Sequence, residues 1–134
     1  MPVTRSEALE LRSASDVVSV RQAVRTWAID AGFSLVDQTK IVTAASEIAR
    51  NTVAYGGGGT ALLELITDGN RSGLRVAFED HGPGIPDVQQ ALTDHFTTGT
   101  GLGLGLGGAK RLVNEFAISS KVGEGTRVVI TRWK

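Results

Sequence analysis

The 134-residue chain contains no cysteine, which excludes a disulfide framework, a zinc–thiolate site and a thiol nucleophile. It carries no net charge, because 14 basic residues balance 14 acidic ones, so no overall field attracts nucleic acid or an anionic membrane. No apolar run approaches the roughly 18 residues of a membrane-spanning helix, and the first residues lack the apolar stretch of a signal peptide. We therefore expect a soluble, cytoplasmic protein without nucleic-acid or membrane partners.

The chain length predicts a single domain over residues 1–134, with enough residues for one hydrophobic core. Glycine is abundant, at 17 residues, but six of the glycines fall within residues 99–108. The excess of glycine is therefore local and needs a local explanation.

Two helices are predicted near the start of the chain. Ser13 and Ser34 each begin a Ser-x-x-Asp helix-start signal, and Gly32 and the glycine run at 56–59 suit the two helix ends. Strands are expected over residues 7–12, 60–67 and 74–80, with a terminal hairpin over 118–122 and 126–133. A further helix is expected over 102–116, behind an irregular or short helical segment at 86–98.

The order of these elements, roughly β-α-α-β-β-α-β-β, predicts an α+β two-layer sandwich. Neighbouring strands joined by short turns favour a largely antiparallel or mixed sheet. The helices are expected to cover one face of that sheet.

Asp80 is the first candidate for a functional residue. It shares one face of its strand with apolar side chains, and a buried carboxylate is costly without a partner. Gly82 and Gly84 follow, and they allow the backbone to pass close to a flat ligand. Asp80 is thus a candidate acceptor for an exocyclic amine such as that of adenine, and the alternative is that it caps the turn that follows.

Glu47 and Asn51 form a second candidate pair, because residues four apart on a helix face the same way. The amide oxygen of Asn51 suits a hard cation such as Mg²⁺. Glu47 can accept a proton from a hydroxyl or a water that attacks a phosphoryl group. A solvated polar face is the alternative, but the pair lies at the edge of an apolar stripe rather than opposite it.

The glycine-rich segment reads Gly-Thr-Gly-Leu-Gly-Leu-Gly-Leu-Gly-Gly over residues 99–108. A glycine-rich loop that leads into a helix is a natural site for phosphate. A dinucleotide fingerprint needs a strand just before the loop, and a P-loop needs Gly-Lys-Ser/Thr at its end; the sequence favours neither. We expect the loop amides to meet phosphate oxygens, with hydroxyl donors from Thr97, Thr98 and Thr100.

These motifs follow the order Glu-x-x-x-Asn, Asp-x-Gly-x-Gly and Gly-x-Gly-x-Gly. The pattern resembles the Bergerat-fold ATP site of the gyrase, heat-shock chaperone, histidine-kinase and mismatch-repair superfamily. The resemblance implies ATP and Mg²⁺ as cofactors, Glu47 as catalytic base, Asn51 as Mg²⁺ ligand and Asp80 as the residue that binds the adenine amine. It also places these residues around the nucleotide: Gly82, Gly84, Ile85, Thr97, Thr98, Gly99, Gly101, Leu102, Gly103, Leu104, Gly105 and Thr126. His81 departs from the pattern, since many members carry asparagine after the aspartate.

A stand-alone domain of this length resembles the bacterial serine/threonine kinases of partner-switching pathways. The resemblance is strongest to the RsbT-type switch kinases of the stressosome, with the anti-sigma-factor kinases close behind, and it is carried by residues 80–86, 96–98, 102–106, 110–112, 115–116 and 133. It implies phosphorylation of a STAS-domain protein on serine or threonine. A sigma factor or a PP2C-type phosphatase are further candidate partners, and a homodimer is compatible with it.

Two other functions stay open at this point: a nucleotide-gated binding module, such as an anti-sigma factor, and a minimal ATPase without a protein substrate. The intact Glu47 and Asn51 favour a kinase over a pure binding module. Residues 87–100 are expected to form a lid that nucleotide orders. Arg21 and Arg25, on the first predicted helix, are candidates for docking an acidic partner surface.

Overall fold

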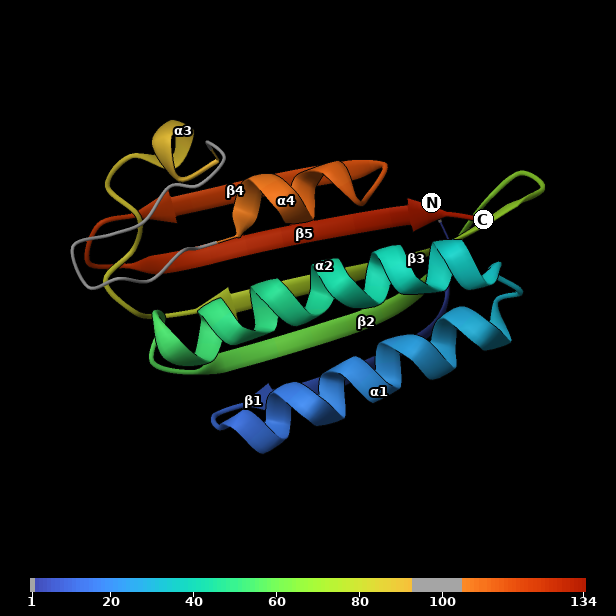
Figure 1. The fold of residues 1–134 in the computed structure, drawn as a ribbon, viewed down its shortest axis with the longest axis horizontal. Helices are drawn as coiled ribbons and strands as arrows, with labels where there is room; N and C mark the ends of the chain where they lie inside the picture. The colour runs from blue at the N-terminus through green and yellow to red at the C-terminus, as the bar shows by residue number, and fades with distance from the viewer. Residues whose placement is uncertain (1, 93–104) are drawn as a thin grey trace.

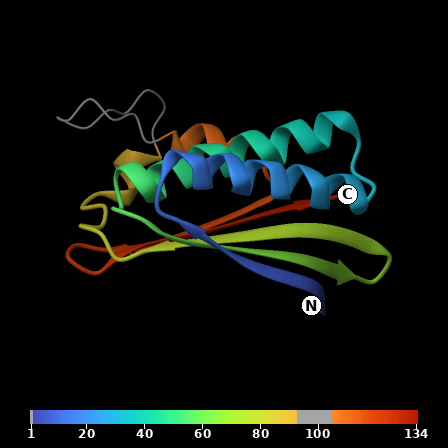
Figure 2. The ribbon, with the colours of Figure 1, turned by 90° about the horizontal axis from the view of Figure 1, so that it is seen from below.

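The computed structural model describes residues 2–92 and 105–134. Its elements are β1 (Val3–Leu11), α1 (Ala14–Asp30), α2 (Leu35–Ala54), β2 (Gly59–Asp68), β3 (Arg71–Asp80), α3 (Val88–Ala91), α4 (Leu106–Arg111), β4 (Glu115–Lys121) and β5 (Gly125–Trp133). The strands form one sheet in the order β1-β2-β3-β5-β4, and every described pair is antiparallel. Helices α1 and α2 lie side by side over one face of this sheet (Figures 1 and 2). The predicted α+β two-layer sandwich is confirmed.

Both long helices begin at the predicted serine caps. Ser13 Oγ accepts a hydrogen bond from the Asp16 backbone N–H at 3.3 Å, and Ser34 Oγ accepts one from Asp37 N–H at 3.1 Å. These bonds satisfy backbone donors that the first turn of a helix leaves unpaired. Gly32 then adopts a φ of +82° in the turn between the helices, a conformation that glycine tolerates best.

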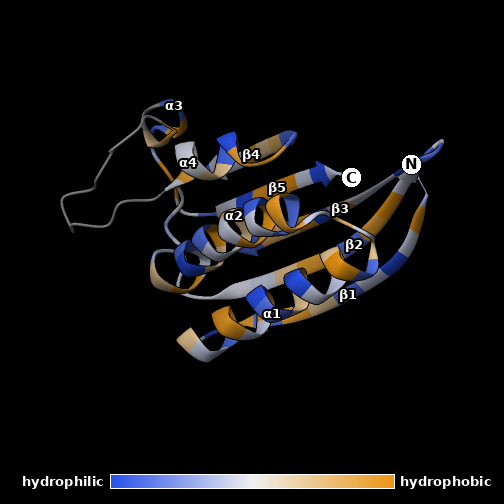
Figure 3. Cartoon of the chain, turned by 45° about the vertical axis from the view of Figure 1, so that its right-hand side comes forward, coloured by the Kyte–Doolittle hydropathy of each residue, from blue (hydrophilic) through white to orange (hydrophobic). Residues whose placement is uncertain are grey.

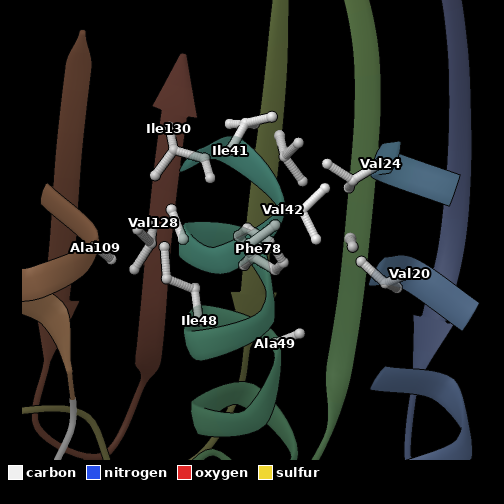
Figure 4. Packing of buried hydrophobic residues seen from close by; sticks show 14 of the residues in the cluster. Val20, Val24, Ile41, Val42, Ile48, Ala49, Phe78, Ala109, Val128 and Ile130 are labelled. Carbon is white, nitrogen blue, oxygen red and sulfur yellow. The ribbon is translucent and has the colours of Figure 1, made fainter. Parts of the chain in front are cut away.

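The core lies between the two long helices and the sheet (Figure 4). Figure 3 shows hydrophobic and hydrophilic residues interleaved along the helices and strands, as expected for elements with one buried side. Ten side chains labelled in Figure 4 are each no more than 4% exposed: Val20, Val24, Ile41, Val42, Ile48, Ala49, Phe78, Ala109, Val128 and Ile130. Burying each of the larger ones contributes about 1.5–3 kcal/mol.

Several predicted strand boundaries were wrong by up to three residues, including the starts of β3 and β4, and two boundaries were wrong by more. The first strand begins at Val3 rather than at residue 7, because pairing with β2 continues to Ile66 through residues that are polar and exposed. The helix expected over 102–116 ends at Arg111, and residues 115–116 belong to β4. Here pairing with β5 outweighs the helical spacing of apolar residues, since Asn114 N–H already donates to Thr131 O at 2.9 Å.

Candidate functional site

A pocket opens between α2, α4 and the adjoining ends of β3 and β5. Its lining residues come from these elements and from the segment after β3: Ile48, Asn51, Thr52, Tyr55, Phe78, Asp80, Ile85, Leu106, Thr126 and Val128. Four of them are predicted site residues that come from three regions far apart in the sequence: Asn51, Asp80 with Ile85, and Thr126. The fold therefore brings these four together around one mostly apolar cavity.

Asp80 ends β3 with its side chain on the apolar face, and it is only 8% exposed. Its Oδ1 accepts hydrogen bonds from Gly82 N–H at 2.9 Å and from Thr126 N–H at 3.3 Å. Within residues 2–92 and 105–134, no donor is bonded to Oδ2. Oδ1 therefore caps the turn that follows β3, as the alternative interpretation of Asp80 expected. Oδ2 remains able to accept a hydrogen bond from a ligand.

Three glycines pack tightly around Asp80. A Cβ on Gly56 would lie 2.4 Å from Asp80 Oδ2, and one on Gly125 would lie 2.1 Å from Asp80 O. A Cβ on Gly82 would lie 2.5 Å from Gly56 O. Such distances are far inside van der Waals contact, so no larger residue fits without a backbone shift. Sequence reasoning identified Gly56 only as a helix end and missed its contact with the carboxylate.

Gly84 lies against the protein's own backbone. Its φ is +76°, and a Cβ there would lie 2.2 Å from Lys121 O in β4. The sequence interpretation placed a ligand beside Gly82 and Gly84, and this stays a prediction; the structure adds that main chain fills the space where a Cβ of either residue would lie. Because neither glycine has a side chain, the segment that carries Ile85 can lie directly against the backbone of Gly56 and Lys121.

Ser120 links this segment to β5 and was not predicted. Its Oγ accepts a hydrogen bond from Ile85 N–H at 2.7 Å, lies 3.1 Å from Gly125 O, and shares a hydrogen bond with Thr126 Oγ1 at 2.8 Å. The sequence did carry one signal for this role. Ser120 lies on the same face of β4 as the apolar Phe116 and Ile118, where a polar side chain needs a hydrogen-bond partner. Ser120 therefore fixes both Ile85 and Thr126, two of the pocket-lining residues.

Glu47 and Asn51 lie one turn apart on α2, as predicted. Asn51 lines the pocket, while Glu47 stands beside it, with 37% of its side chain exposed and an ion pair to Arg50. A Cβ on Gly105 would lie 2.6 Å from Glu47 Oε2. Gly105 is the first described residue of the glycine-rich segment and directly precedes α4, so Glu47 faces the point where that segment enters the helix.

The remaining predicted residues divide into two groups. Thr97, Thr98, Gly99, Thr100, Gly101, Leu102, Gly103 and Leu104 lie outside the described residues, as does the expected lid beyond residue 92. His81 is described, with its side chain 84% exposed and its Nε2 4.0 Å from Glu79 Oε1. His81 therefore points into solvent and does not line the apolar pocket.

The described residues fit an adenine nucleotide with a magnesium ion. Apolar side chains line the pocket beside the available Asp80 oxygen, which suits a flat ring bearing an amine. The described part of the chain holds no cluster of three or more His, Cys, Asp or Glu that would bind a metal alone. Mg²⁺ needs no such cluster, because one or two protein oxygens together with phosphates and water complete its shell.

Within the described residues, no helix has the length and apolarity that a bilayer crossing requires.

Comparison with known proteins gives a family and several relatives. Residues 36–134 match the family described as histidine kinase-, DNA gyrase B-, and HSP90-like ATPase. The chain is 46% identical over 118 residues to the serine/threonine-protein kinase RsbT of Bacillus subtilis (strain 168), which covers 88% of this chain and 89% of the relative. It is 32% identical over 106 residues to the anti-sigma F factor of Anoxybacillus flavithermus, which covers 74% of this chain and 71% of the relative.

Two solved structures share the fold at low sequence identity. The catalytic domain of histidine kinase ThkA aligns with a TM-score of 0.54 and 13% identity, covering 98% of this chain and 95% of that one. A chain of the SiaB–SiaC complex from Pseudomonas aeruginosa aligns with a TM-score of 0.54 and 10% identity, covering 98% and 91%. At these identities the likeness concerns the fold alone.

Proposed function

Since the chain belongs to the histidine kinase-, DNA gyrase B- and HSP90-like ATPase family, we propose that it is an ATP- and Mg²⁺-dependent serine/threonine kinase of a partner-switching pathway. The observation that carries the proposal is the pocket that unites Asp80 and Asn51 beside Glu47. The 46% identity to a serine/threonine kinase over most of both chains supports it. We further propose that residues 1–134 act as a single cytoplasmic domain.

Asp80 selects the nucleotide in this proposal. Its Oδ2 accepts a hydrogen bond from the adenine amine, while Oδ1 stays bonded to two backbone N–H groups. Apolar neighbours from α2, β3 and β5 enclose the ring, and Thr126 adds a hydroxyl at its edge. A hydrogen bond to a charged carboxylate in such a dry site is stronger than one in water.

Glu47 supplies the base. It accepts the proton of a serine or threonine hydroxyl while that oxygen bonds to the γ-phosphorus, and the bond from this phosphorus to the β–γ bridging oxygen breaks. Asn51 offers its amide oxygen to Mg²⁺, which would neutralise phosphate charge. Lys110 and Arg111, in the last turn of α4, are further candidate cations. Most of the rate gain comes from positioning and charge neutralisation.

We propose a STAS-domain protein as the phosphate acceptor. The similarity to an anti-sigma F factor supports one alternative, in which the chain binds a sigma factor under the control of nucleotide. In that alternative the chain phosphorylates the antagonist protein that opposes its binding to the sigma factor. A PP2C-type phosphatase is a further candidate partner, and a homodimer is a candidate assembly. These choices share one nucleotide site and differ in what docks on the surface.

The test is a pull-down from lysate of the source cell, with and without Mg²⁺–ATP, using the chain and its Glu47→Gln variant as bait. Recovered proteins are then incubated with ATP labelled on the γ-phosphate. We expect a STAS-domain protein that the wild-type chain labels on serine or threonine and the variant does not. Recovery of a sigma factor instead supports the anti-sigma alternative, and ATP hydrolysis without any partner supports a minimal ATPase.

A further inference from the structure

We propose that Arg50 is a positioning residue for Glu47, holding one carboxylate oxygen so that the other lies over Gly105. The inference rests on the proposed function, because it gives Glu47 the part of general base. It adds a residue at an unspecified position of the Glu-x-x-x-Asn motif, outside the pocket lining. It also assigns Gly105 a contact with the base, at the junction between the glycine-rich segment and α4.

The first contact lies within α2. Arg50 Nη2 donates a hydrogen bond to Glu47 Oε1 across one helical turn. The two side chains are 49% and 37% exposed, so the pair contributes little to folding stability. What the contact does is restrict the rotation of the Glu47 carboxylate, since a guanidinium binds carboxylate oxygens in a fixed planar arrangement.

The second contact comes from the other side of the carboxylate. A Cβ on Gly105 would lie 2.6 Å from Glu47 Oε2 and 3.3 Å from its Cδ. Gly105 also has a φ of +65°, which directs the chain into α4 and which side-chain-bearing residues rarely adopt. Glycine at this position therefore serves twice: it makes the turn, and it leaves space for Oε2.

Together the two contacts leave Oε1 occupied and Oε2 directed toward the glycine-rich segment. A general base must come within hydrogen-bond reach of the hydroxyl that it deprotonates. A displacement of about 1 Å in a reacting group costs on the order of 100-fold in rate. Loss of Arg50 should consequently lower the rate of phosphoryl transfer and leave ATP affinity unchanged, because Arg50 does not line the pocket.

The experiment compares Arg50→Gln and Arg50→Lys with the wild-type chain. Single-turnover transfer of labelled γ-phosphate is measured on the STAS-domain protein from the pull-down and on water, and ATP affinity is measured by calorimetry. We expect Arg50→Gln to lower transfer by about 10- to 100-fold with ATP affinity within about twofold. Arg50→Lys should restore only part of the rate, because lysine keeps the charge and a hydrogen-bond donor but not the planar guanidinium. Arg71→Gln is the control for the loss of an exposed (i, i+3) ion pair, since Arg71 pairs with Asp68 at the β2–β3 turn. Arg71 also lies over the Trp133 ring, so the unfolding temperature of this variant is measured alongside its transfer rate.

Two further comparisons separate positioning from a general structural effect. In a Glu47→Gln background, Arg50→Gln should have no additional effect on transfer. Arg50 is proposed to act only through the Glu47 carboxylate, and this background lacks that carboxylate. Gly105→Ala should lower transfer, whereas Gly69→Ala should not. Gly69 has nearly the same φ, +62°, but a Cβ there meets nothing within 4 Å, so it carries the same backbone strain without the contact.

The outcomes distinguish this inference from the function beneath it. Full transfer by Arg50→Gln, in a chain that still depends on Glu47, overturns the positioning role and leaves the kinase intact. A fall in ATP affinity that accounts for the lost transfer also overturns it, since Arg50 would then bind nucleotide. A wild-type chain that transfers phosphate to neither protein nor water overturns the proposed function and the inference with it.

Discussion

Asp80 divides its two carboxylate oxygens between the protein and the pocket. Oδ1 accepts from two backbone N–H groups, one from each side of the site, so among the residues that the structure describes the carboxylate is held without a side-chain cation. Oδ2 lies against Gly56, whose missing side chain leaves room for it. A residue held this firmly can discriminate between ligands, because an unsuitable ligand leaves a buried acceptor unpaired.

Asp80→Asn tests this division. An asparagine can keep the Oδ1 bonds but presents an amide donor where Oδ2 stood, so it opposes the adenine amine with another donor. We expect ATP affinity to fall by about 10- to 100-fold, with little change in the unfolding temperature. Calorimetry measures the affinity, and an unchanged dissociation constant would contradict the adenine role.

Glu47→Gln makes the complementary prediction. The amide keeps the size of the side chain and removes the ability to accept a proton at physiological pH. Phosphoryl transfer should fall by about 100- to 10,000-fold while ATP still binds. Single-turnover kinetics and calorimetry on the same preparation check both halves, and transfer at the wild-type rate would show that another group is the base.

At the scale of elements, Arg132 ties three of them together. It extends from β5, donates to Asp37 in the first turn of α2 at 2.7 Å, and donates to Leu112 O just after α4 at 3.0 Å. The guanidinium beside Asp37 holds the pKa of that carboxyl below its ordinary value. This cluster fixes the start of the helix that carries Glu47 and the end of the helix that follows Gly105.

The lowered pKa predicts a pH dependence. Because the folded state favours the ionised form of Asp37, the pair stabilises the protein above the unfolded-state pKa of about 3.9, and this is lost as pH falls through the lower folded-state value. Asp37→Asn should therefore lower the unfolding temperature at pH 7. The difference from wild type should begin to shrink below about pH 4 and should vanish only once pH has fallen below the folded-state pKa. Thermal unfolding across this range measures it.

Asp30→Asn serves as the control, since Asp30 at the end of α1 pairs with Arg5 of β1 where both side chains are about half exposed, and this pair contributes little at any pH. A difference between Asp37→Asn and wild type that persists unchanged at low pH would show that the carboxylate charge is not the cause.

The sequence predicted elements best where the signal is local. The helix starts at Ser13 and Ser34 depend on bonds within three residues, and both were found. The boundary between α4 and β4 depends on pairing with β5, and the apolar spacing of residues 102–116 alone cannot show it. Ser120 was missed for the same reason, because it acts on Ile85, 35 residues away in the chain.

For the whole molecule, stability depends on the layer between the helices and the sheet. Ile130 is fully buried in β5 and contacts this core, so Ile130→Ala removes three methyl or methylene groups and leaves a cavity. The expected loss is about 2–5 kcal/mol from a total stability of about 5–15 kcal/mol. Urea denaturation measures the loss. Val122→Ala, at a side chain in the β4–β5 turn that is 69% exposed, should change stability by less than about 0.5 kcal/mol.

The outer face of α1 offers a prediction about partners. Arg21 and Arg25 are exposed there, and neither forms an ion pair with any residue that the structure describes. If they dock an acidic surface, the double substitution Arg21→Glu and Arg25→Glu should slow association with the STAS-domain protein by about tenfold or more at low salt. ATP affinity should not change. Surface plasmon resonance at two salt concentrations measures the rate, and an unaffected rate would exclude this face.

The place of β5 in the sheet also determines which strand edge is exposed while the chain is being synthesised. β5 lies between β3 and β4, although its residues are synthesised after both of theirs. About 45 residues separate the end of β3 from the start of β5, and ribosomes add them in about 2–9 seconds. During that time β3 presents an unpaired edge, which is the kind of surface that recruits strands from other chains. The interval between residues 80 and 125 is therefore when the nascent protein is most prone to aggregate and has most need of a chaperone.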